Sequence, residues 1–193
     1  MSTAQTMPTI SPQTYLEAER RAAFKSEYFD GHVYAMAGGT RAHIILEGNL
    51  GFEVVGRLRG RSCESYGSNM KVWIPSTRAF VYPDLTIACG SPKLRDDYRD
   101  VLENPVAIFE ILSPSTEMYD RTLKFDGFCS IPDFAQYVLI SQVAPRVEVF
   151  TKNAEGFWIF TRFTGLDATA EFSTVGIEVP MASLYDRIEF AAA

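Results

Sequence analysis

Two carboxylates interrupt apolar stretches of this chain. Asp84 follows a proline in YPDLTIACG (residues 82–90), and Glu110 lies within AIFEIL (residues 107–112). A carboxylate inside a buried strand is costly unless it is paired or binds a cation. Two such groups about 4 Å apart repel each other by roughly 4 kcal/mol at an intermediate dielectric. A magnesium ion would offset both penalties, because Mg²⁺ prefers hard oxygen ligands.

A lysine on the next predicted helix is a candidate partner for these acids. Lys124 lies one helical turn after Asp120 and three residues after Arg121, so this face can turn a lysine and an arginine toward the carboxylates. The alternative is a surface salt bridge between Asp120 and Lys124, and such an exposed pair is worth only about 0.3–0.5 kcal/mol. Residue spacing alone leaves both interpretations open.

Two further residues can be interpreted either as functional or as purely structural. Glu27 ends a charged stretch, so it is either a surface acid or a member of the site. His43 lies at the start of a predicted long helix, where a packing histidine is as reasonable as a functional one.

The elements that must position these residues follow from caps, turns and periodicity. Ser11 and Pro12 begin a short helix, Asp30-Gly31 predicts a hairpin, and Thr40 caps a helix over 41–60. The remaining predicted elements are strands at 68–75, 80–89 and 105–112, a helix within 113–131, strands at 135–140, 145–152 and 157–164, and a strand with a helical turn at 176–186. This order predicts an α/β or α+β fold with helices on a mixed sheet.

Composition limits the class of protein. The chain has 193 residues, 47% of them hydrophobic, which suits one domain over residues 11–190 after a flexible segment 1–10. No apolar run approaches the roughly 20 residues that span a bilayer, and the start lacks a signal-peptide layout, so a cytoplasmic protein is expected. Three widely spaced cysteines fit neither a disulfide framework nor a metal site and are interpreted as core residues.

The net charge of −6 disfavours a protein that binds nucleic acid over its whole surface. It leaves room for a local basic cleft, which a nucleic-acid binder needs. The candidate residues for such a cleft are Arg57, Arg59, Arg61, Lys71, Arg121 and Lys124.

Three stretches of the sequence together resemble a known family. The run YPDLTIACG … NPVAIFEILSPSTEMYDRTLKFDGF resembles the Uma-type family of restriction endonuclease-like proteins, within the PD-(D/E)XK nuclease superfamily. SEYFDGHVYAMAGGTRAH is similar to the entry segment of that family, and AQYVLISQVAPRVEVF to its closing hairpin. The resemblance covers residues 11–185.

The resemblance implies a fold and a chemistry. The fold is a restriction-endonuclease-like αβββαβ core with a mixed central sheet, extended here by an N-terminal hairpin and C-terminal strands. The chemistry is metal-dependent hydrolysis of a phosphodiester, with DNA as the expected substrate. By resemblance, Asp84, Glu110 and the main-chain carbonyl of Ile111 hold Mg²⁺ or Mn²⁺, and the metal activates water.

The chain departs from the superfamily pattern at several positions. The usual lysine two residues after the second acid is Leu112 here, and the resemblance implies that Lys124 replaces it. Gln136, Ser141 and Phe128 also differ from the residues frequent in the family. These positions lie outside the implied metal ligands, so they bear on substrate contacts.

Three functions therefore remain open from the sequence. The first is a magnesium-dependent endonuclease, expected to act as a homodimer because closed two-fold dimers are the commonest assembly. The second is a nuclease-like fold kept as a binding module without effective catalysis. The third is a metal-dependent hydrolase of another phosphate ester.

Overall fold

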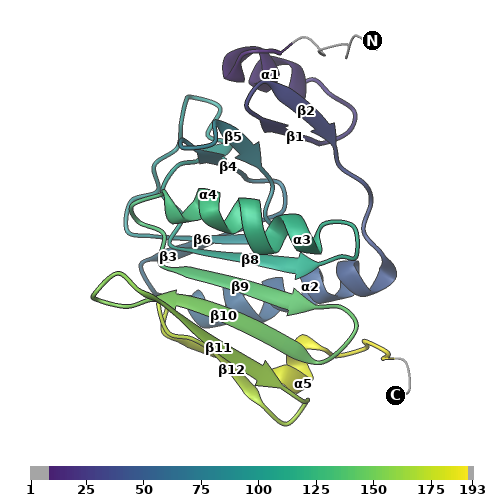
Figure 1. The fold of residues 1–193 in the computed structure, drawn as a ribbon. Helices are drawn as coiled ribbons and strands as arrows, with labels where there is room; N and C mark the ends of the chain where they lie inside the picture. The colour runs from purple at the N-terminus through teal and green to yellow at the C-terminus, as the bar shows by residue number, and fades with distance from the viewer. Residues whose placement is uncertain (1–8, 191–193) are drawn as a thin grey trace, which may run out of the picture.

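The computed structural model describes residues 9–190 and shows sheets with helices on either side (Figure 1). The helices are α1 (Pro12–Glu19), α2 (Arg41–Leu58), α3 (Glu117–Tyr119), the π-helical turn η1 (Asp120–Lys124), α4 (Phe125–Cys129) and α5 (Met181–Leu184). The strands are β1 (Ser26–Phe29), β2 (His32–Ala35), β3 (Cys63–Gly67), β4 (Lys71–Ile74), β5 (Ala79–Val81), β6 (Leu85–Cys89), β7 (Val101–Leu102), β8 (Ala107–Leu112), β9 (Gln136–Ser141), β10 (Arg146–Lys152), β11 (Trp158–Thr164), β12 (Thr169–Phe172) and β13 (Ile177–Pro180).

The central feature is a six-stranded sheet with the order β11-β10-β9-β8-β6-β3. Strands β8 and β9 run parallel and the other neighbours are antiparallel, so the sheet is mixed. The parallel pair needs a crossover connection, and α3, η1 and α4 supply it. A five-stranded sheet, β2-β1-β5-β4-β7, and the pair β12-β13 complete the fold. The predicted α+β class is confirmed.

Alternation along β8 separates two layers of core on the six-stranded sheet. Phe109 and Ile111 face the cluster built on α2 and α5, whereas Ile108 and Leu112 face the cluster under α4. The helices therefore cover opposite faces of this sheet, as Figure 1 shows for α2 and α4. Glu110 shares the face of Ile108 and Leu112, so its side chain points toward the crossover helices.

Helix α2 forms for the reasons that its sequence suggests. The Thr40 hydroxyl caps it by accepting the N–H of His43 at 3.1 Å. Leu46, Leu50 and Val54 recur every fourth residue and are fully buried. Among residues 9–190, no helix is both long enough and apolar enough to cross a membrane.

The N-terminal hairpin also follows the prediction. Strands β1 and β2 pair with Phe29 opposite His32, which leaves Asp30 and Gly31 as a two-residue turn. Both turn residues have positive φ, 41° and 97°, as a type I′ turn requires. Ile10 donates its N–H to the carbonyl of Gly31 at 2.9 Å. Residues 1–8 of the predicted flexible segment lie outside the described part of the chain.

The predicted strand 80–89 is two strands in the structure. Its first part is β5 in the five-stranded sheet, and its second part is β6 in the six-stranded sheet. The break falls at Pro83 and Asp84, because a proline has no N–H to continue a ladder. Strand β3, which the sequence analysis left unassigned, pairs with β6 along the edge of the six-stranded sheet.

The interpretation of all cysteines as unpaired core residues was wrong. Cys63 of β3 and Cys89 of β6 lie opposite each other in the ladder and form a disulfide. The sequence did not reveal this pair, because the two cysteines are 26 positions apart and several elements lie between them. Cys129 has a free thiol and is partly buried.

Candidate active site

Asp84 and Glu110 lie on neighbouring strands. Leu85 pairs with Phe109 in the antiparallel ladder of β6 and β8, so Asp84, one residue before β6, comes next to Glu110 in the same register. The Oδ2 atom of Asp84 accepts the main-chain N–H of Ile111 at 2.6 Å. This bond joins Asp84 to the strand that carries Glu110, and it places the main chain of Ile111 beside the first carboxylate.

His43 holds the other oxygen of Asp84. Its Nε2 atom lies 3.0 Å from Oδ1 of Asp84, and both side chains are largely buried. The hydrogen bond to Asp84 raises the pKa of His43, although burial works in the opposite direction. With both oxygens hydrogen bonded, Asp84 has a fixed orientation. His43 is thus in contact with the site rather than only packed in the helix.

Lys124 lies inside a group of carboxylates. Its Nζ atom is 3.0 Å from Oε1 of Glu110, 3.2 Å from Oδ1 of Asp120 and 3.4 Å from Oε1 of Glu27. The side chains of Lys124, Glu110 and Asp120 are 7%, 5% and 4% exposed. The alternative of an exposed Asp120–Lys124 surface pair therefore does not apply.

The π-helical turn η1 brings two charged residues into this interior. Asp120 begins η1 and Lys124 ends it, and both are buried, whereas Leu123 between them is exposed. The hydroxyl of Tyr137 donates to the main-chain carbonyl of Asp120 at 2.9 Å, which fixes the turn against β9. Such turns inside helices occur frequently at functional sites.

Glu27 reaches the same group from β1. Its Oε1 atom accepts the main-chain N–H of Tyr82 at 3.0 Å and faces Lys124. Its side chain is 15% exposed, so Glu27 is not a free surface acid. The site therefore combines residues from the N-terminal hairpin, α2, β8 and η1, with Asp84 between β5 and β6.

The electrostatics of the group are dominated by negative charge. Burial raises the pKa of Glu110 well above its ordinary value, and Asp120, Asp84 and Glu27 raise it further against the opposing effect of Lys124. Burial also disfavours the ammonium of Lys124, but the surrounding acids outweigh this and raise its pKa. Lys124 is therefore charged, and the carboxylates together exceed the positive charge that faces them.

The donor set fits a hard divalent cation. It consists of carboxylate oxygens with excess negative charge. Oδ1 of Asp120 is buried, makes no hydrogen bond and is paired by charge with the ammonium of Lys124 at 3.2 Å. Within residues 9–190, no three His, Cys, Asp or Glu side chains are gathered as a metal site. The implied set of Asp84, Glu110 and the Ile111 carbonyl includes only two such side chains.

The predicted basic cleft does not assemble from all its candidates. Arg121 bonds Glu117 at 2.8 Å and Glu148 at 2.5 Å instead of Asp84 or Glu110. Arg57 pairs with Glu53 on its own helix, and Lys71 pairs with Asp100. The guanidinium of Arg61 donates to the carbonyls of Val175 and Gly176. Of the six candidates, Lys124 contacts the carboxylate group.

Gln142 is a site residue that the sequence analysis missed. Its amide accepts from the Thr40 hydroxyl at 2.6 Å and donates to the carbonyl of Leu112 at 2.8 Å, and it lies 3.5 Å from Nδ1 of His43. These contacts join the start of α2 to the end of β8 behind the His43–Asp84 pair. A polar residue after a buried strand was the available signal, but its partners are distant in sequence.

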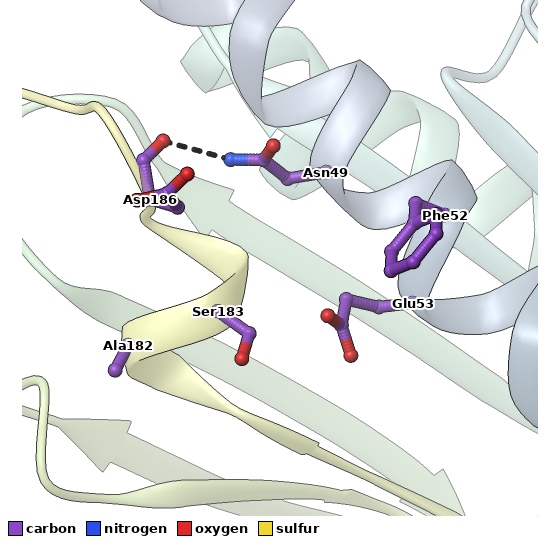
Figure 2. A pocket seen from close by; sticks show the side chains of 6 residues that line it. All are labelled: Asn49, Phe52, Glu53, Ala182, Ser183 and Asp186. Carbon is purple, nitrogen blue, oxygen red and sulfur yellow. Dashed lines mark hydrogen bonds between the residues drawn. The ribbon is translucent and has the colours of Figure 1, made fainter.

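A separate hollow lies on the other face of the sheet, between α2 and α5 (Figure 2). Its volume is about 390 Å³, and its lining residues are Asn49, Phe52, Glu53, Ala182, Ser183 and Asp186. The Asn49 amide donates to the main-chain carbonyl of Asp186 at 2.9 Å, which ties the two helical segments together. This hollow has a structural contact at its edge and does not include the carboxylate group.

Comparison with known proteins places the chain in a family. A family model named Uma2, with the description "Putative restriction endonuclease", matches residues 12–182. Two proteins of Synechocystis are each 32% identical: "Uncharacterized protein slr1290" over 95% of both chains, and "Uncharacterized protein sll1609" over 92% of this chain and all of that protein.

A solved structure has the same fold. It is the crystal structure of "a putative nuclease belonging to DUF820" from Anabaena variabilis, with a TM-score of 0.75 and 15% identity. The match covers 93% of this chain and 99% of that one. Together with the family match over most of the sequence, these similarities show that the chain belongs to the Uma2 family of restriction endonuclease-like proteins.

Proposed function

We propose that this protein is an endonuclease that hydrolyses phosphodiester bonds in DNA with Mg²⁺ or Mn²⁺. The observation that carries the proposal is the buried ammonium of Lys124 among Glu110, Asp120 and Glu27, next to an oriented Asp84. Buried charges of this kind are expensive, and they cluster at functional sites. Membership of the Uma2 family supports a nuclease.

Each residue of the group has a chemical role in this proposal. Asp84 and Glu110, with the carbonyl of Ile111, would hold the metal, which when bound supplies an activated water and neutralises phosphate charge. His43 and the N–H of Ile111 keep Asp84 in one orientation. Lys124 supplies a fixed cation beside Glu110, where negative charge develops on the phosphate.

Glu27 and Asp120 keep the ammonium of Lys124 in place. Each of their carboxylates lies within 3.4 Å of Nζ. The carboxylate of Glu27 accepts the main-chain N–H of Tyr82, and the main-chain carbonyl of Asp120 accepts the hydroxyl of Tyr137. Their negative charges also favour the charged form of Lys124. These two acids are therefore supporting residues in the proposal.

A metal titration tests the proposal. Duplex DNA is incubated with wild type, Asp84→Ala and the control Asp186→Ala, whose side chain is 69% exposed near the C-terminus. We expect cleavage by wild type and by the control with Mg²⁺ or Mn²⁺, none with a chelator, and none by Asp84→Ala. Cleavage that persists in Asp84→Ala, or that needs no divalent ion, contradicts the proposed site.

The competing function is a binding module with the same fold. Two observations favour it: the superfamily lysine position is occupied by the buried Leu112, and the chain carries a net charge of −6. DNA binding by wild type without cleavage under any divalent ion would support this alternative.

As part of the main proposal, we place the enzyme in the cytoplasm and expect it to act as a homodimer.

A further inference from the structure

A second buried carboxylate lies on the same sheet, surrounded by arginines. Glu148 of β10 is 5% exposed, and Arg121 of η1 donates to its Oε2 atom at 2.5 Å. On its other oxygen, Arg162 of β11 lies at 3.1 Å and Arg146 of β10 at 3.8 Å. We call these four residues the arginine cluster. One carboxylate thus faces three guanidinium groups from three elements.

The arginine cluster carries more positive charge than its acids neutralise. Besides Glu148, only Glu117 pairs with it among the described residues, through Arg121 at 2.8 Å. The side chains of Arg146 and Arg162 remain 36% and 52% exposed. The Nε atom of Arg146 is buried, so it is the outer nitrogens of these two exposed side chains that can meet an anion. The cluster therefore has guanidinium donors left for an anion from solvent.

The register of the sheet places this cluster beside the candidate active site. Leu139 of β9 pairs with Glu110 on one side and with Glu148 on the other, and Glu148 pairs with Arg162. Residues opposite one another in a ladder lie on one face, so these side chains point toward the crossover helices. Two strand spacings of about 4.8 Å put Glu148 roughly 10 Å from Glu110.

We propose that Arg146 and Arg162 form a subsite in which each guanidinium binds one backbone phosphate of the nucleic acid, about three nucleotides from the phosphate that is cleaved. The inference rests on the proposed nuclease function and adds how the substrate is positioned. A guanidinium presents a planar fork that matches phosphate oxygens. The distance of roughly 10 Å corresponds to about three nucleotides of axial rise at 3.4 Å each.

Glu148 and Arg121 act as the support of this subsite. Glu148 holds Arg162 through Nε at 3.2 Å and through a terminal nitrogen, so the outer edge of that guanidinium is directed away from the sheet. Arg121 attaches Glu148 to η1, the same turn that ends in Lys124. The subsite and the candidate active site are thereby held by one π-helical turn.

Salt-dependent binding tests the inference. Binding of a fluorescent DNA duplex is measured by anisotropy in the presence of a chelator, over a series of salt concentrations. The variants are the double substitution Arg146→Gln with Arg162→Gln, the charge-preserving double substitution to lysine, and the control Arg187→Gln. Arg187 is 81% exposed and lies beyond α5, whose side chains pack on the opposite face of the sheet.

Loss of two phosphate contacts has a defined signature. The slope of log K against log salt should decrease by roughly 0.9 for each contact, or about 1.8 for the glutamine double variant. The lysine double variant should keep most of the slope, and the control should match wild type. In cleavage assays we expect KM to rise with little change in kcat, because these contacts bind substrate and transition state alike.

The possible outcomes separate the two proposals. Unchanged slope and affinity in the glutamine double variant, with wild type binding and cleaving DNA, overturn the subsite and leave the nuclease standing. A wild type that neither binds nor cleaves DNA overturns both. If the double variant lacks a cooperative thermal transition, the single Arg162→Gln variant is used in the same salt-dependence measurement. Its slope should decrease by roughly 0.9, and an unchanged slope overturns the subsite.

Discussion

At the scale of single residues, Lys124 is the group on which the carboxylate cluster depends. It is the shared partner of three acids, and its side chain is 7% exposed. Removing one partner of a buried ion pair typically costs about 3–5 kcal/mol, because the remaining charge is left without compensation. A role in catalysis and a role in stability are therefore joined in this residue.

We expect Lys124→Met to lose both activity and stability. Cleavage should fall by about 100-fold or more, and the free energy of unfolding at neutral pH by about 3–5 kcal/mol. The pKa of Glu110 is already raised by burial, and without Lys124 the folded state should bind more protons than the unfolded state. Stability of the variant should therefore increase as pH falls toward about 4.5 and decrease as pH rises. Chemical denaturation at several pH values measures this, and a variant as stable as wild type at pH 7 contradicts it.

Glu110→Gln should separate the role of the carboxylate cluster in catalysis from its role in stability. The amide keeps the shape of the side chain but removes a buried charge, while Lys124 retains Asp120 and Glu27 as partners. We expect the variant to unfold at a temperature no lower than wild type and to lose metal-dependent cleavage by about 100-fold or more. The matched control is Glu103→Gln, a half-exposed acid that pairs with Arg95. Full activity in Glu110→Gln would remove Glu110 from the site.

The residue scale also shows what the sequence could predict. Glu110 stands out in AIFEIL because a charge in a buried strand needs a partner, and the structure supplies one in Lys124. Glu148 in RVEVF has the same signal, but two of its three arginines come from β11 and η1 and are not recognisable from spacing. Ion pairs between distant segments depend on strand register, which a single sequence does not reveal.

At the scale of elements, the disulfide fastens an edge strand. Cys63 and Cys89 join β3 to β6, the strand that follows Asp84, and close a loop with a sequence separation of 26 residues. A loop of this length stabilises the folded chain by roughly 3 kcal/mol in the chain-entropy description. We expect a reductant, or the double substitution of both cysteines by serine, to lower the melting temperature. Cys129→Ser is the control, and an identical melting temperature with and without reductant would contradict the link.

The stability of the protein at acid pH should depend on the ion pairs that attach the end of α1 to Asp100. Arg20, which follows α1, and Lys71 of β4 both bond Asp100, at 2.7 and 2.9 Å. Burial alone would raise the pKa of Asp100, but these hydrogen bonds and charges outweigh it and lower the pKa to about 2. The stabilisation is present above the unfolded pKa of 3.8 and is lost as pH falls toward 2. Compared with Asp100→Asn, wild type should be more stable at pH 6 by roughly 1 kcal/mol after screening, and the difference should vanish near pH 2. A difference that does not depend on pH contradicts the assignment.

The element scale also marks where prediction from sequence ends. The hairpin at Asp30-Gly31 and the cap of α2 were predicted, because local residues determine both. The division of 80–89 between two sheets was not, because it depends on which strands are available as neighbours. Nothing in the sequence distinguishes the π-helical turn from an ordinary helix, since the same residues suit both.

At the scale of the whole molecule, the six-stranded sheet ends in a strand with a free edge. Within the described residues, β11 pairs with β10 alone, and Ile159 and Phe160 are 50% and 47% exposed. Exposed apolar edges are sites at which sheets from two chains can pair. This edge is therefore the surface that we assign to the proposed homodimer.

We expect light scattering to give twice the chain mass of 21.6 kDa. The substitution Ile159→Lys should shift the equilibrium between dimer and monomer toward the monomer, because a charge on an edge strand opposes pairing. Val143→Lys, at an exposed loop position, should leave the dimer intact. A monomer at all concentrations refutes the homodimer, and a dimer that persists in Ile159→Lys refutes this edge as its surface.

The π-helical turn has a consequence for chain length rather than residue type. A π-turn closes its hydrogen bonds from i to i+5 and an α-turn from i to i+4, so η1 contains one residue more than a regular turn of the same helix. That residue can be removed while α3 and α4 keep their places on the sheet. Relatives with an unbroken helix should therefore have one residue fewer between the second acid and the lysine. In such relatives, alignment by fixed spacing would place the wrong residue opposite Lys124.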